Sequence, residues 1–293
     1  MPSTKDRRIQ YSQNYLRSQR LVTRLVEQSS LGPTDVVIEI GPGKGVITEA
    51  LARRCAHVLA VERDPHHVAV LRERFPAGGK VTVFAGDFLD FPLPASRYKV
   101  FASIPYRITT AIVSKLTSGV SPPDDSYLVM QQEAADKFAG LAKETLAALC
   151  LKPRFAPTIA HRFQRADFVP APRVESVLLR LQRRATPLVA PEHDQRFRDF
   201  VTAVFVAWQP SVGTALADVL PKAAHRHLRA RHVACLELKQ SELPFEHWLA
   251  IFDDLLQDGD RRVWSKIDGA ETRLAQQQSR LTKQHRTRVN NRS

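Results

Sequence analysis

A glycine-rich turn near the start of the chain is the first feature able to bind a ligand. The turn, Gly41-Pro42-Gly43-Lys44-Gly45, directly follows the β-branched run 36–40 and precedes a helix predicted over 46–54. Glycines between a strand and a helix let a ligand approach the backbone closely, and the helix start offers free amides. The spacing G-x-G-x-G is one residue shorter than the dinucleotide motif G-x-G-x-x-G, so it indicates another ligand.

Acidic residues at the ends of predicted strands indicate which ligand. Glu39, two residues before Gly41, would repel a pyrophosphate but suits a ligand with an ammonium and a sulfonium group, such as S-adenosylmethionine. Glu62, 21 residues after Gly41, ends the next strand, where a carboxylate accepts both ribose hydroxyls. Asp87 and Phe88 follow the third strand, where they would meet an adenine. One such acid alone is usually a cap or turn residue, but the ordered set predicts a cofactor site.

The tetrapeptide Ser103-Ile104-Pro105-Tyr106, after the fourth predicted strand, fits methyl transfer to an aromatic amine. Such an amine is a poor nucleophile because its lone pair is delocalised, and acceptors on its hydrogens, the Ile104 carbonyl and the Ser103 hydroxyl, would localise that pair. Pro105 would stiffen the loop, and Tyr106 would stack on a flipped-out base. No general base is required, since the product cation loses its proton to water. Taken alone, the tetrapeptide also fits a simple loop stiffener.

The elements that must position these residues form an α/β pattern. Helix-length segments alternate with six β-branched runs, which predicts a mostly parallel, Rossmann-like sheet with crossover helices. The predicted strands are 36–40, 58–62, 81–85, 99–103, 127–131 and 177–181.

The chain divides at a charged, proline-containing break. We predict a methyltransferase domain over 1–182, including an N-terminal segment that closes over the cofactor, a linker over 183–191 and an all-helical, RNA-binding domain over 192–257. The helical domain rests on apolar residues at helical spacing: Phe197, Phe200, Val201, Val204, Phe205, Trp208, Phe245, Trp248, Leu249, Phe252, Leu255 and Leu256. The uncharged run 200–217 is long enough to span a membrane, but Pro210 favours a broken, buried helix.

Composition points to a polyanionic partner. The 293 residues carry a net charge of +13, which favours nucleic acid first and an anionic membrane surface second. Three widely spaced cysteines and a start without an apolar segment indicate a cytoplasmic protein with reduced thiols. Residues 259–293 have nine Lys/Arg against three Asp/Glu, so 258–293 is predicted to be a basic, flexible tail that is solvated or contacts RNA.

Other charged residues fit RNA contacts or a plain surface. Arg17, Arg20 and Arg24 share one predicted helix face, which contacts RNA phosphates or is simply solvated, and Arg107 is placed for a phosphate beside the flipped base. The histidines and cysteine of 225–235 fit no standard metal site and are interpreted as surface residues, so no metal is expected.

The ordered motifs resemble the rRNA adenine N6-methyltransferase family. They are the segment at 12–16, EIGPGKG at 39–45, VERD at 61–64, GDF at 86–88, SIPYRIT at 103–109 and FVPAPRVES at 168–176. The helical C-terminal domain ending in LPFEHWLAIFDDLL (243–256) and the basic tail are similar to the Erm branch, which confers macrolide, lincosamide and streptogramin B resistance. The resemblance covers residues 12–256.

The resemblance implies methylation of one adenine in the peptidyl-transferase loop of 23S rRNA, once or twice, with S-adenosylmethionine as cofactor. The implied substrate is 23S rRNA, naked or in an assembly intermediate, and nothing in the sequence requires more than a monomer. The implied cofactor residues are Gln13, Asn14, Leu16, Glu39, Gly41, Gly43, Glu62, Arg63, Asp87, Phe88 and Ser103. Those implied at the target base are Ser103, Ile104, Pro105 and Tyr106, with Phe168 as a second ring on its other face.

One departure and two alternatives stay open at this point. The family has Asn where this chain has Ser103, and a shorter hydroxyl accepts one hydrogen bond, which affects efficiency or the number of methyl groups. The alternatives are a small-subunit 16S rRNA dimethyladenosine transferase and a non-catalytic RNA-binding protein on the same fold.

Overall fold

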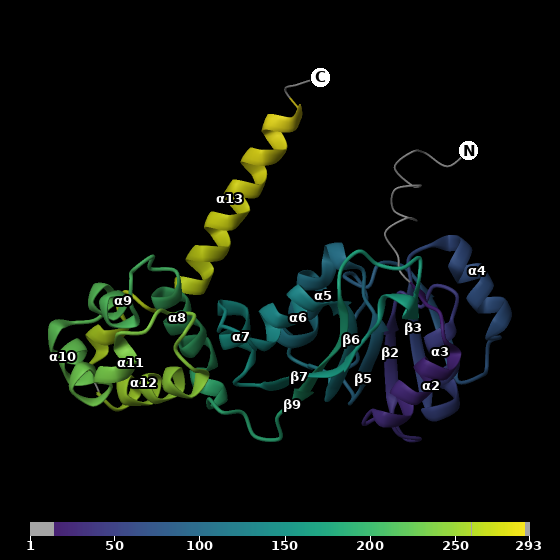
Figure 1. Ribbon diagram of the computed structural model, residues 1–293, viewed down its shortest axis with the longest axis horizontal. Coiled ribbons are helices and arrows are strands. Elements are labelled where there is room, and N and C mark those ends of the chain that lie inside the picture. Colours follow the sequence, from purple (N-terminus) through teal and green to yellow (C-terminus); the bar gives the residue numbers. More distant parts are fainter. Residues whose placement is uncertain (1–14, 259, 291–293) are drawn as a thin grey trace. The chain divides into compact units, whose positions relative to one another are not determined.

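The structure, a computed structural model, describes residues 15–258 and 260–290, with side chains up to residue 280. It divides into two compact units (Figure 1). The α/β unit holds the chain up to Asp136 together with Phe155–Ala185. The helical unit holds Lys137–Arg154 and the chain from Thr186 onward.

The α/β unit is built on a seven-stranded sheet of order β4-β3-β2-β5-β6-β9-β7. Its strands are β2 (Val36–Ile40), β3 (His57–Glu62), β4 (Val81–Ala85), β5 (Lys99–Ser103), β6 (Asp125–Gln131), β7 (Phe155–Arg162) and β9 (Ser176–Arg183). The pairs from β4 to β6 are parallel, and β9 runs antiparallel to both β6 and β7. All six predicted strands are present within two residues at each end, and the predicted mostly parallel sheet is confirmed.

The strand order reverses between β2 and β5, the two central parallel strands. The glycine-rich turn follows β2 and the tetrapeptide begins at the end of β5. Open α/β sheets bind ligands at the carboxyl ends of the strands where the order reverses. The topology therefore brings the two motifs to one edge of the sheet.

Strand β7 was not among the predicted strands, and it contains a proline, Pro157. Proline has no amide to donate to a ladder and is confined to edge strands and bulges. In the structure β7 is the last strand of the sheet and carries a register shift between Ile159 and His161. An edge strand with a bulge tolerates this proline.

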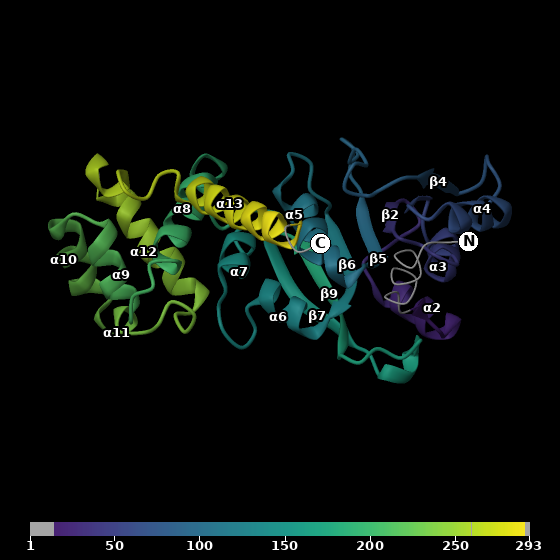
Figure 2. The same cartoon turned by 90° about the horizontal axis from the view of Figure 1, so that it is seen from above.

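Helices α2 and α3 pack together beside β2 and β3, whereas α5 lies beside β5 and β6 (Figures 1 and 2). The helices of this unit are α2 (Gln19–Gln28), α3 (Val46–Arg54), α4 (Pro65–Arg74), α5 (Thr109–Ser118) and α6 (Gln132–Ala139), the last crossing into the helical unit, with the 3-10 turns η1 (Tyr106–Ile108) and η2 (Arg165–Asp167). The side chain of Ser18 caps α2 by accepting from the Leu21 amide at 3.2 Å. Buried Val22, Val26 and Leu51 join the strand residue Val37 in one core.

A second, two-stranded ladder joins distant parts of the α/β unit. Strand β1 (Tyr15–Leu16) pairs antiparallel with β8 (Phe168–Val169), with Tyr15 opposite Val169 and Leu16 opposite Phe168. The Arg17 amide continues the ladder by donating to the Asp167 carbonyl at 2.8 Å. The segment before α2 is thereby fixed to the chain beyond β7.

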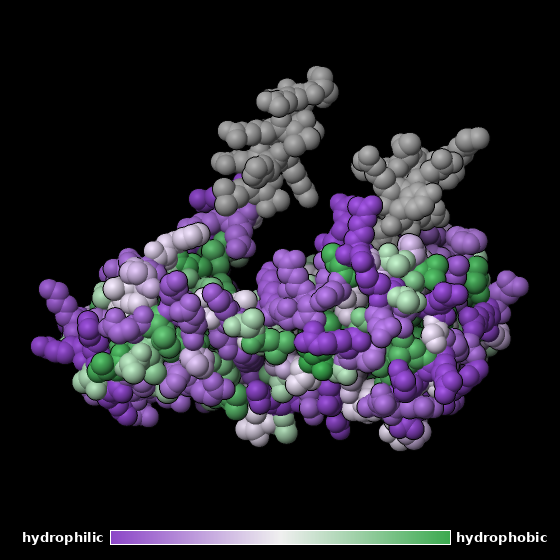
Figure 3. Space-filling model, viewed as in Figure 1, coloured by the Kyte–Doolittle hydropathy of each residue, from purple (hydrophilic) through white to green (hydrophobic). Residues whose placement is uncertain are grey.

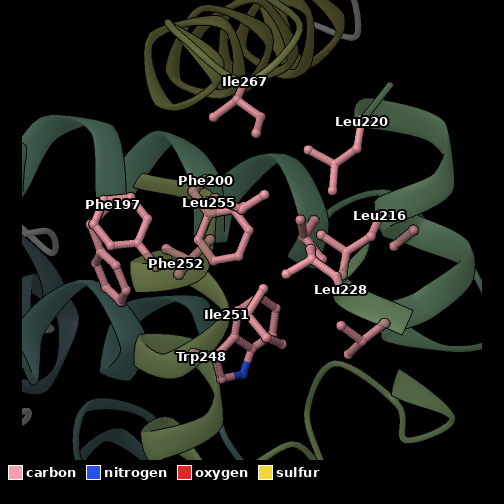
Figure 4. Close-up of a cluster of buried hydrophobic side chains, with 14 of the residues drawn as sticks. Phe197, Phe200, Leu216, Leu220, Leu228, Trp248, Ile251, Phe252, Leu255 and Ile267 are labelled. Carbon is pink, nitrogen blue, oxygen red and sulfur yellow. The ribbon is translucent and has the colours of Figure 1, made fainter. Parts of the chain in front are cut away.

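The helical unit surrounds an aromatic core (Figure 4). Phe200 lies 5.9 Å from Trp248 and 5.7 Å from Phe252 between ring centroids, and all three are fully buried. The helices are α7 (Leu146–Leu151), α8 (Asp194–Phe205), α9 (Val212–Val219), α10 (Lys222–Arg231), α11 (Val233–Leu236), α12 (Phe245–Gln257) and α13 (Ala270–Asn290), with the 3-10 turns η3 (Pro191–His193) and η4 (Arg261–Trp264). The predicted apolar helices are present, and the run broken at Pro210 is confirmed as α8 and α9.

Trp208 departs from the predicted apolar pattern. The spacing placed it on the buried face of a helix that continues from Phe205, but α8 ends at Phe205. Trp208 lies in the following loop with φ of 52° and a side chain that is 98% exposed. The prediction that its ring joins the core is wrong, because the change of backbone direction turns it outward.

The structure also differs from the predicted domain bounds and tail. Residues 137–154, assigned by the sequence to the first domain, belong to the helical unit, where Leu149 is fully buried in the core. The chain beyond residue 258 includes η4 and α13 rather than an extended arm, and Val263 and Ile267 are fully buried against the helical core (Figure 4).

In the described part of the chain, no helix is long and apolar enough to cross a membrane.

Candidate active site

The glycine turn adopts a conformation that only glycine takes readily. Gly41, Gly43 and Gly45 have φ of 66°, 56° and 78°. A Cβ on Gly43 would also lie 2.6 Å from the Tyr15 ring, too close to be accommodated without movement. The turn thus packs tightly beneath β1 and leads into α3 at Gly45.

The carboxylate of Glu62 holds the glycine turn to the end of β3. Its Oε2 accepts from the Gly43 amide at 3.0 Å, and its Oε1 accepts from the Asp64 amide at 2.8 Å. The side chain is buried, and each carboxylate oxygen has a second lone pair. Glu62 is therefore rigidly placed and still able to accept hydrogen bonds from a ligand.

Glu39 is a buried acid that lacks a partner. Neither of its carboxylate oxygens has a hydrogen-bond partner among the described residues, and the residue is only 1% exposed. Burial, with a smaller contribution from the charge of Glu62, raises its pKa to about 8. The Thr48 hydroxyl and backbone amide lower the pKa to a lesser extent, since they lie near the carboxyl without reaching good hydrogen-bond geometry. Because an isolated buried carboxylate is costly, this orphaned acid at the end of β2 suits a cationic ligand, as S-adenosylmethionine is.

The third strand end carries Asp87 and Phe88 beside Glu62. The Gly86 amide donates to the Glu62 carbonyl at 2.8 Å, which joins the two strand ends. Oδ1 of Asp87 accepts from the Leu89 amide at 2.9 Å, and Oδ2 lies 3.4 Å from a guanidinium nitrogen of Arg63. The structure thus brings Glu62, Arg63 and Asp87 to adjacent strand ends, whereas the buried ring of Phe88 stacks on Phe91 and lies under the Lys115 ammonium.

The tetrapeptide is held between β6 and η1. The Ile104 amide donates to the Val129 carbonyl of β6 at 3.1 Å, and Ile104 is buried. Pro105 precedes η1, and the Thr109 hydroxyl donates to the Pro105 and Tyr106 carbonyls. The loop is thus fixed on both sides of Ser103 and Tyr106.

One cavity of about 280 Å³ joins the two motifs. It is lined by the β1 segment, the glycine turn, the start of α3 and the tetrapeptide: Tyr15, Leu16, Arg17, Gly41, Pro42, Lys44, Val46, Ile47, Ser103, Ile104, Pro105, Tyr106 and Val169. Leu16, Gly41 and the complete tetrapeptide therefore share one space. The other described residues predicted for the cofactor do not line it: Glu39, Gly43, Glu62, Arg63, Asp87 and Phe88. Gln13 and Asn14 lie outside the described residues.

Phe168 does not line this cavity. Its ring is 3% exposed, lies 5.2 Å from that of Phe163, and lines a neighbouring cavity that Ser176 also borders. The β8 residue in the Tyr106 cavity is Val169, because side chains alternate along a strand. In this structure Phe168 is thus beside the Tyr106 cavity rather than facing Tyr106 across it.

The arginines predicted to bind RNA are exposed. Arg20 and Arg24 lie on the face of α2 opposite its buried residues, Arg17 lies at the wall of the cavity, and Arg107 follows Tyr106 directly. Positive charge therefore flanks the cavity at Arg17 and Arg107.

Several residues at the site were given no role from the sequence, among them Tyr15, Lys44, Val169 and Ser176. Tyr15 and Val169 lie opposite each other in the β1–β8 ladder. Ser176 forms a hydrogen bond with Tyr106, from which it is 70 residues away in the sequence. The only signal for Ser176 was its place in the motif at 168–176, and local spacing gave no reason to assign it a role.

Comparison with known proteins agrees with this geometry. A family model described as ribosomal RNA adenine dimethylase matches residues 4–256. The chain is 30% identical over 270 residues to an rRNA adenine N-6-methyltransferase of Saccharopolyspora erythraea, covering 90% of this chain and 70% of the relative. It is 31% identical over 203 residues to the ribosomal RNA small subunit methyltransferase A of Geobacter metallireducens, covering 66% of this chain and 74% of the relative.

A solved structure is similar over nearly the same extent. The crystal structure of the 23S rRNA methyltransferase ErmE matches with a TM-score of 0.76 and 28% identity, covering 83% of this chain and 100% of that one. The fold is the Rossmann-like methyltransferase fold. With the family model matching most of its length, the chain belongs to the ribosomal RNA adenine dimethylase family of methyltransferases.

Proposed function

We propose that this enzyme transfers one or two methyl groups from S-adenosylmethionine to the N6 amine of one adenine in the peptidyl-transferase loop of 23S rRNA. It would act as a monomer in the cytoplasm and confer macrolide, lincosamide and streptogramin B resistance. The observation that carries the proposal is the single cavity shared by the glycine turn and the complete tetrapeptide.

The residues of the first three strand ends suit the cofactor. Glu62 would accept from the ribose hydroxyls, Asp87 and Phe88 would meet the adenine, and Arg63 would lie beside them. The orphaned carboxylate of Glu39 would balance the positive charge of the ligand, close to Gly41 and Gly43. When bound, S-adenosylmethionine supplies an electrophilic methyl group on its sulfonium.

The tetrapeptide residues would position and activate the target amine. The Ser103 hydroxyl and the Ile104 carbonyl would accept its two hydrogens, which concentrates the lone pair on nitrogen. Tyr106, oriented by Ser176, would stack on the base, and Pro105 would limit movement of the loop. Arg17, Arg20 and Arg107 would contact flanking phosphates.

The structural comparison supports 23S over 16S rRNA as the substrate. The ErmE structure, named as a 23S rRNA methyltransferase, matches over 83% of this chain at 28% identity, whereas the small-subunit relative aligns over 66%. A match of that extent includes much of the helical unit. The small-subunit alternative rests on the similar identity of the shorter alignment.

The test is methyl transfer from labelled S-adenosylmethionine to protein-free 23S and 16S rRNA, with the modified position mapped by primer extension. We expect one modified adenine in 23S rRNA and increased macrolide resistance in a susceptible host. Exclusive labelling of 16S rRNA supports the small-subunit alternative. If the protein binds RNA but transfers no methyl group to either rRNA, the proposed function is rejected and the chain is a non-catalytic RNA-binding protein.

A further inference from the structure

Trp208 combines an unfavourable backbone conformation with a fully exposed ring. Its φ of 52° lies in the left-handed region, which bulky residues rarely adopt, and its side chain is 98% exposed. Neither local backbone preference nor burial of the ring accounts for a tryptophan here. A residue held in such a conformation at the surface indicates a functional constraint.

The loop that carries Trp208 is fixed on both sides. Before it, the Val206 amide donates to the Thr202 carbonyl at 3.1 Å at the end of α8. After it, the side-chain amide of Gln209 donates to the Asp218 carboxylate at 2.6 Å, and the backbone carbonyl of Gln209 accepts from the side-chain amide of Gln240 at 3.2 Å. The ring is therefore presented from an ordered backbone, which reduces the entropy lost when it binds a partner.

Positive charge without acidic partners lies on the segments packed against this loop. Lys239 precedes Gln240, and the ring of His225 lies 2.9 Å from the Gly213 carbonyl, which joins α10 to the start of α9. Lys222 and Arg226 of α10 are exposed, and Figure 3 shows hydrophilic side chains beside hydrophobic ones at this end of the helical unit. Within the described residues, Lys222, Arg226 and Lys239 make no ion pair.

We propose that Trp208 stacks on an unpaired base of the rRNA substrate, with Lys222, Arg226 and Lys239 contacting the adjoining phosphates. An exposed aromatic ring beside cations is the combination that binds single-stranded nucleic acid. A protein partner is less favoured, because the segments bonded to this loop carry the exposed cations Lys222, Arg226 and Lys239, whereas the acid bonded to it, Asp218, is held by Gln209. This contact is additional to the Tyr106 cavity and depends on the proposed rRNA substrate.

The experiment compares Trp208→Gly and Trp208→Phe with wild type in the full-length protein. The probe is a protein-free rRNA fragment containing the methylated adenine and its neighbouring helices. We expect Trp208→Gly to raise Kd roughly tenfold, equivalent to about 1.4 kcal/mol. Its melting temperature should equal or exceed that of wild type, because glycine adopts a positive φ readily. Trp208→Phe should bind within about threefold of wild type.

A second readout uses the fluorescence of Trp208. Trp248 is buried and Trp264 is partly buried, so iodide should quench mainly Trp208, and bound RNA should protect it. Leu188→Ala, which shortens another exposed apolar side chain of the helical unit, is the matched control and should leave Kd unchanged.

The outcomes separate this proposal from the proposed function. Methyl transfer by wild type identifies which rRNA is the substrate, and the Trp208 comparison then uses that rRNA, so a 16S result refutes only the proposed function. An unchanged Kd for Trp208→Gly overturns the stacking proposal. So does a fall in its melting temperature, or a wild-type dimer that Trp208→Gly abolishes.

Discussion

The hydroxyl oxygen of Tyr106 lies 3.0 Å from Oγ of Ser176, although 70 residues separate the two in the sequence. Ser176 is buried at the start of β9, which pairs with β6, and β6 in turn accepts the Ile104 amide. The sheet therefore fixes the orientation of the ring that would stack on the target base. Tyr106 would therefore contribute to methyl transfer in two ways that can be tested separately, through the aromatic surface of its ring and through the orientation that this hydrogen bond gives the ring.

Tyr106→Ala should lose most methyl transfer while cofactor affinity stays near wild type, because base stacking contributes roughly 1 to 3 kcal/mol. Tyr106→Phe keeps the ring and loses only the Ser176 bond, worth about 0.5 to 1.5 kcal/mol, so a decrease of about threefold to tenfold is expected. Ser176→Ala should match Tyr106→Phe, and the double variant should be no slower than either one. Additive losses in steady-state kinetics would show that the hydrogen bond does not orient the ring.

Glu62→Ala should weaken S-adenosylmethionine binding at least about tenfold. The change removes the ribose acceptor and also frees the amides of Gly43 and Asp64, which the carboxylate now holds. Glu62→Gln keeps one acceptor oxygen and should lose less. Calorimetry gives both affinities, and RNA affinity serves as the control that should barely change. Wild-type cofactor affinity in Glu62→Ala would remove Glu62 from the binding site.

The parts of this site that sequence predicted are those encoded by contiguous motifs at strand ends. Glu39, Glu62, Asp87 and the tetrapeptide each lie at or directly after the end of a run whose pattern identifies a strand, so the parallel topology places them along one edge of the sheet. Ser176 and Tyr15 reach the site through antiparallel pairings between distant segments, for which the sequence pattern contains no register information. Trp208 was misplaced for a related reason, since helical spacing does not reveal where a helix ends.

Ser103→Ala should lower the methylation rate by about one to two orders of magnitude if the hydroxyl accepts a hydrogen bond from the target amine. This estimate corresponds to losing one interaction worth roughly 1.5 to 3 kcal/mol in the transition state. Ser103→Asn, which places the residue usual in this family, should be active, with more dimethylated product. Single-turnover rates and mass spectrometry of the nucleosides measure both effects. An alanine variant as fast as wild type would leave the Ile104 carbonyl as the sufficient acceptor.

The raised pKa of Glu39 should make both the stability of the protein and the binding of the cofactor depend on pH. Its pKa of about 8 lies above the ordinary value of 4.5, so the folded protein favours the neutral acid. The stability contributed by this group is present below about pH 4.5 and is lost as pH rises through 8. Glu39→Gln should therefore melt higher than wild type above pH 8 and similarly near pH 4.5.

A cationic ligand favours the ionised form of Glu39, so binding near pH 7 should release a proton from wild type and none from Glu39→Gln. Calorimetry in two buffers with different ionisation enthalpies measures this release. Equal binding enthalpies for wild type in both buffers would contradict the ionisation of Glu39 on binding.

The last prediction separates two parts of the basic C-terminal segment. Asp199 of α8 accepts from the Gly269 and Glu271 amides, both at 2.9 Å, and so caps the start of α13. Val263 and Ile267 are fully buried, and burial of each contributes about 1.5 to 3 kcal/mol. Truncation after Asp258 should therefore lower the melting temperature by about 5 to 10 °C or more, because it also leaves Asp199 buried without its two donors.

Truncation after Arg280 removes four Lys/Arg and leaves the cap and both buried side chains in place. Its melting temperature should equal that of wild type, whereas the slope of log affinity against log salt should flatten by up to about 3 units, at about 0.7 to 0.9 per phosphate contact. The choice of adenine should stay the same, since that choice depends on the pocket of Tyr106. Filter binding over a salt series, with a melting curve for each protein, measures both effects. An unchanged slope would mean that the end of the chain is a passive, solvated segment, and a lower melting temperature would mean that it stabilises the helical unit.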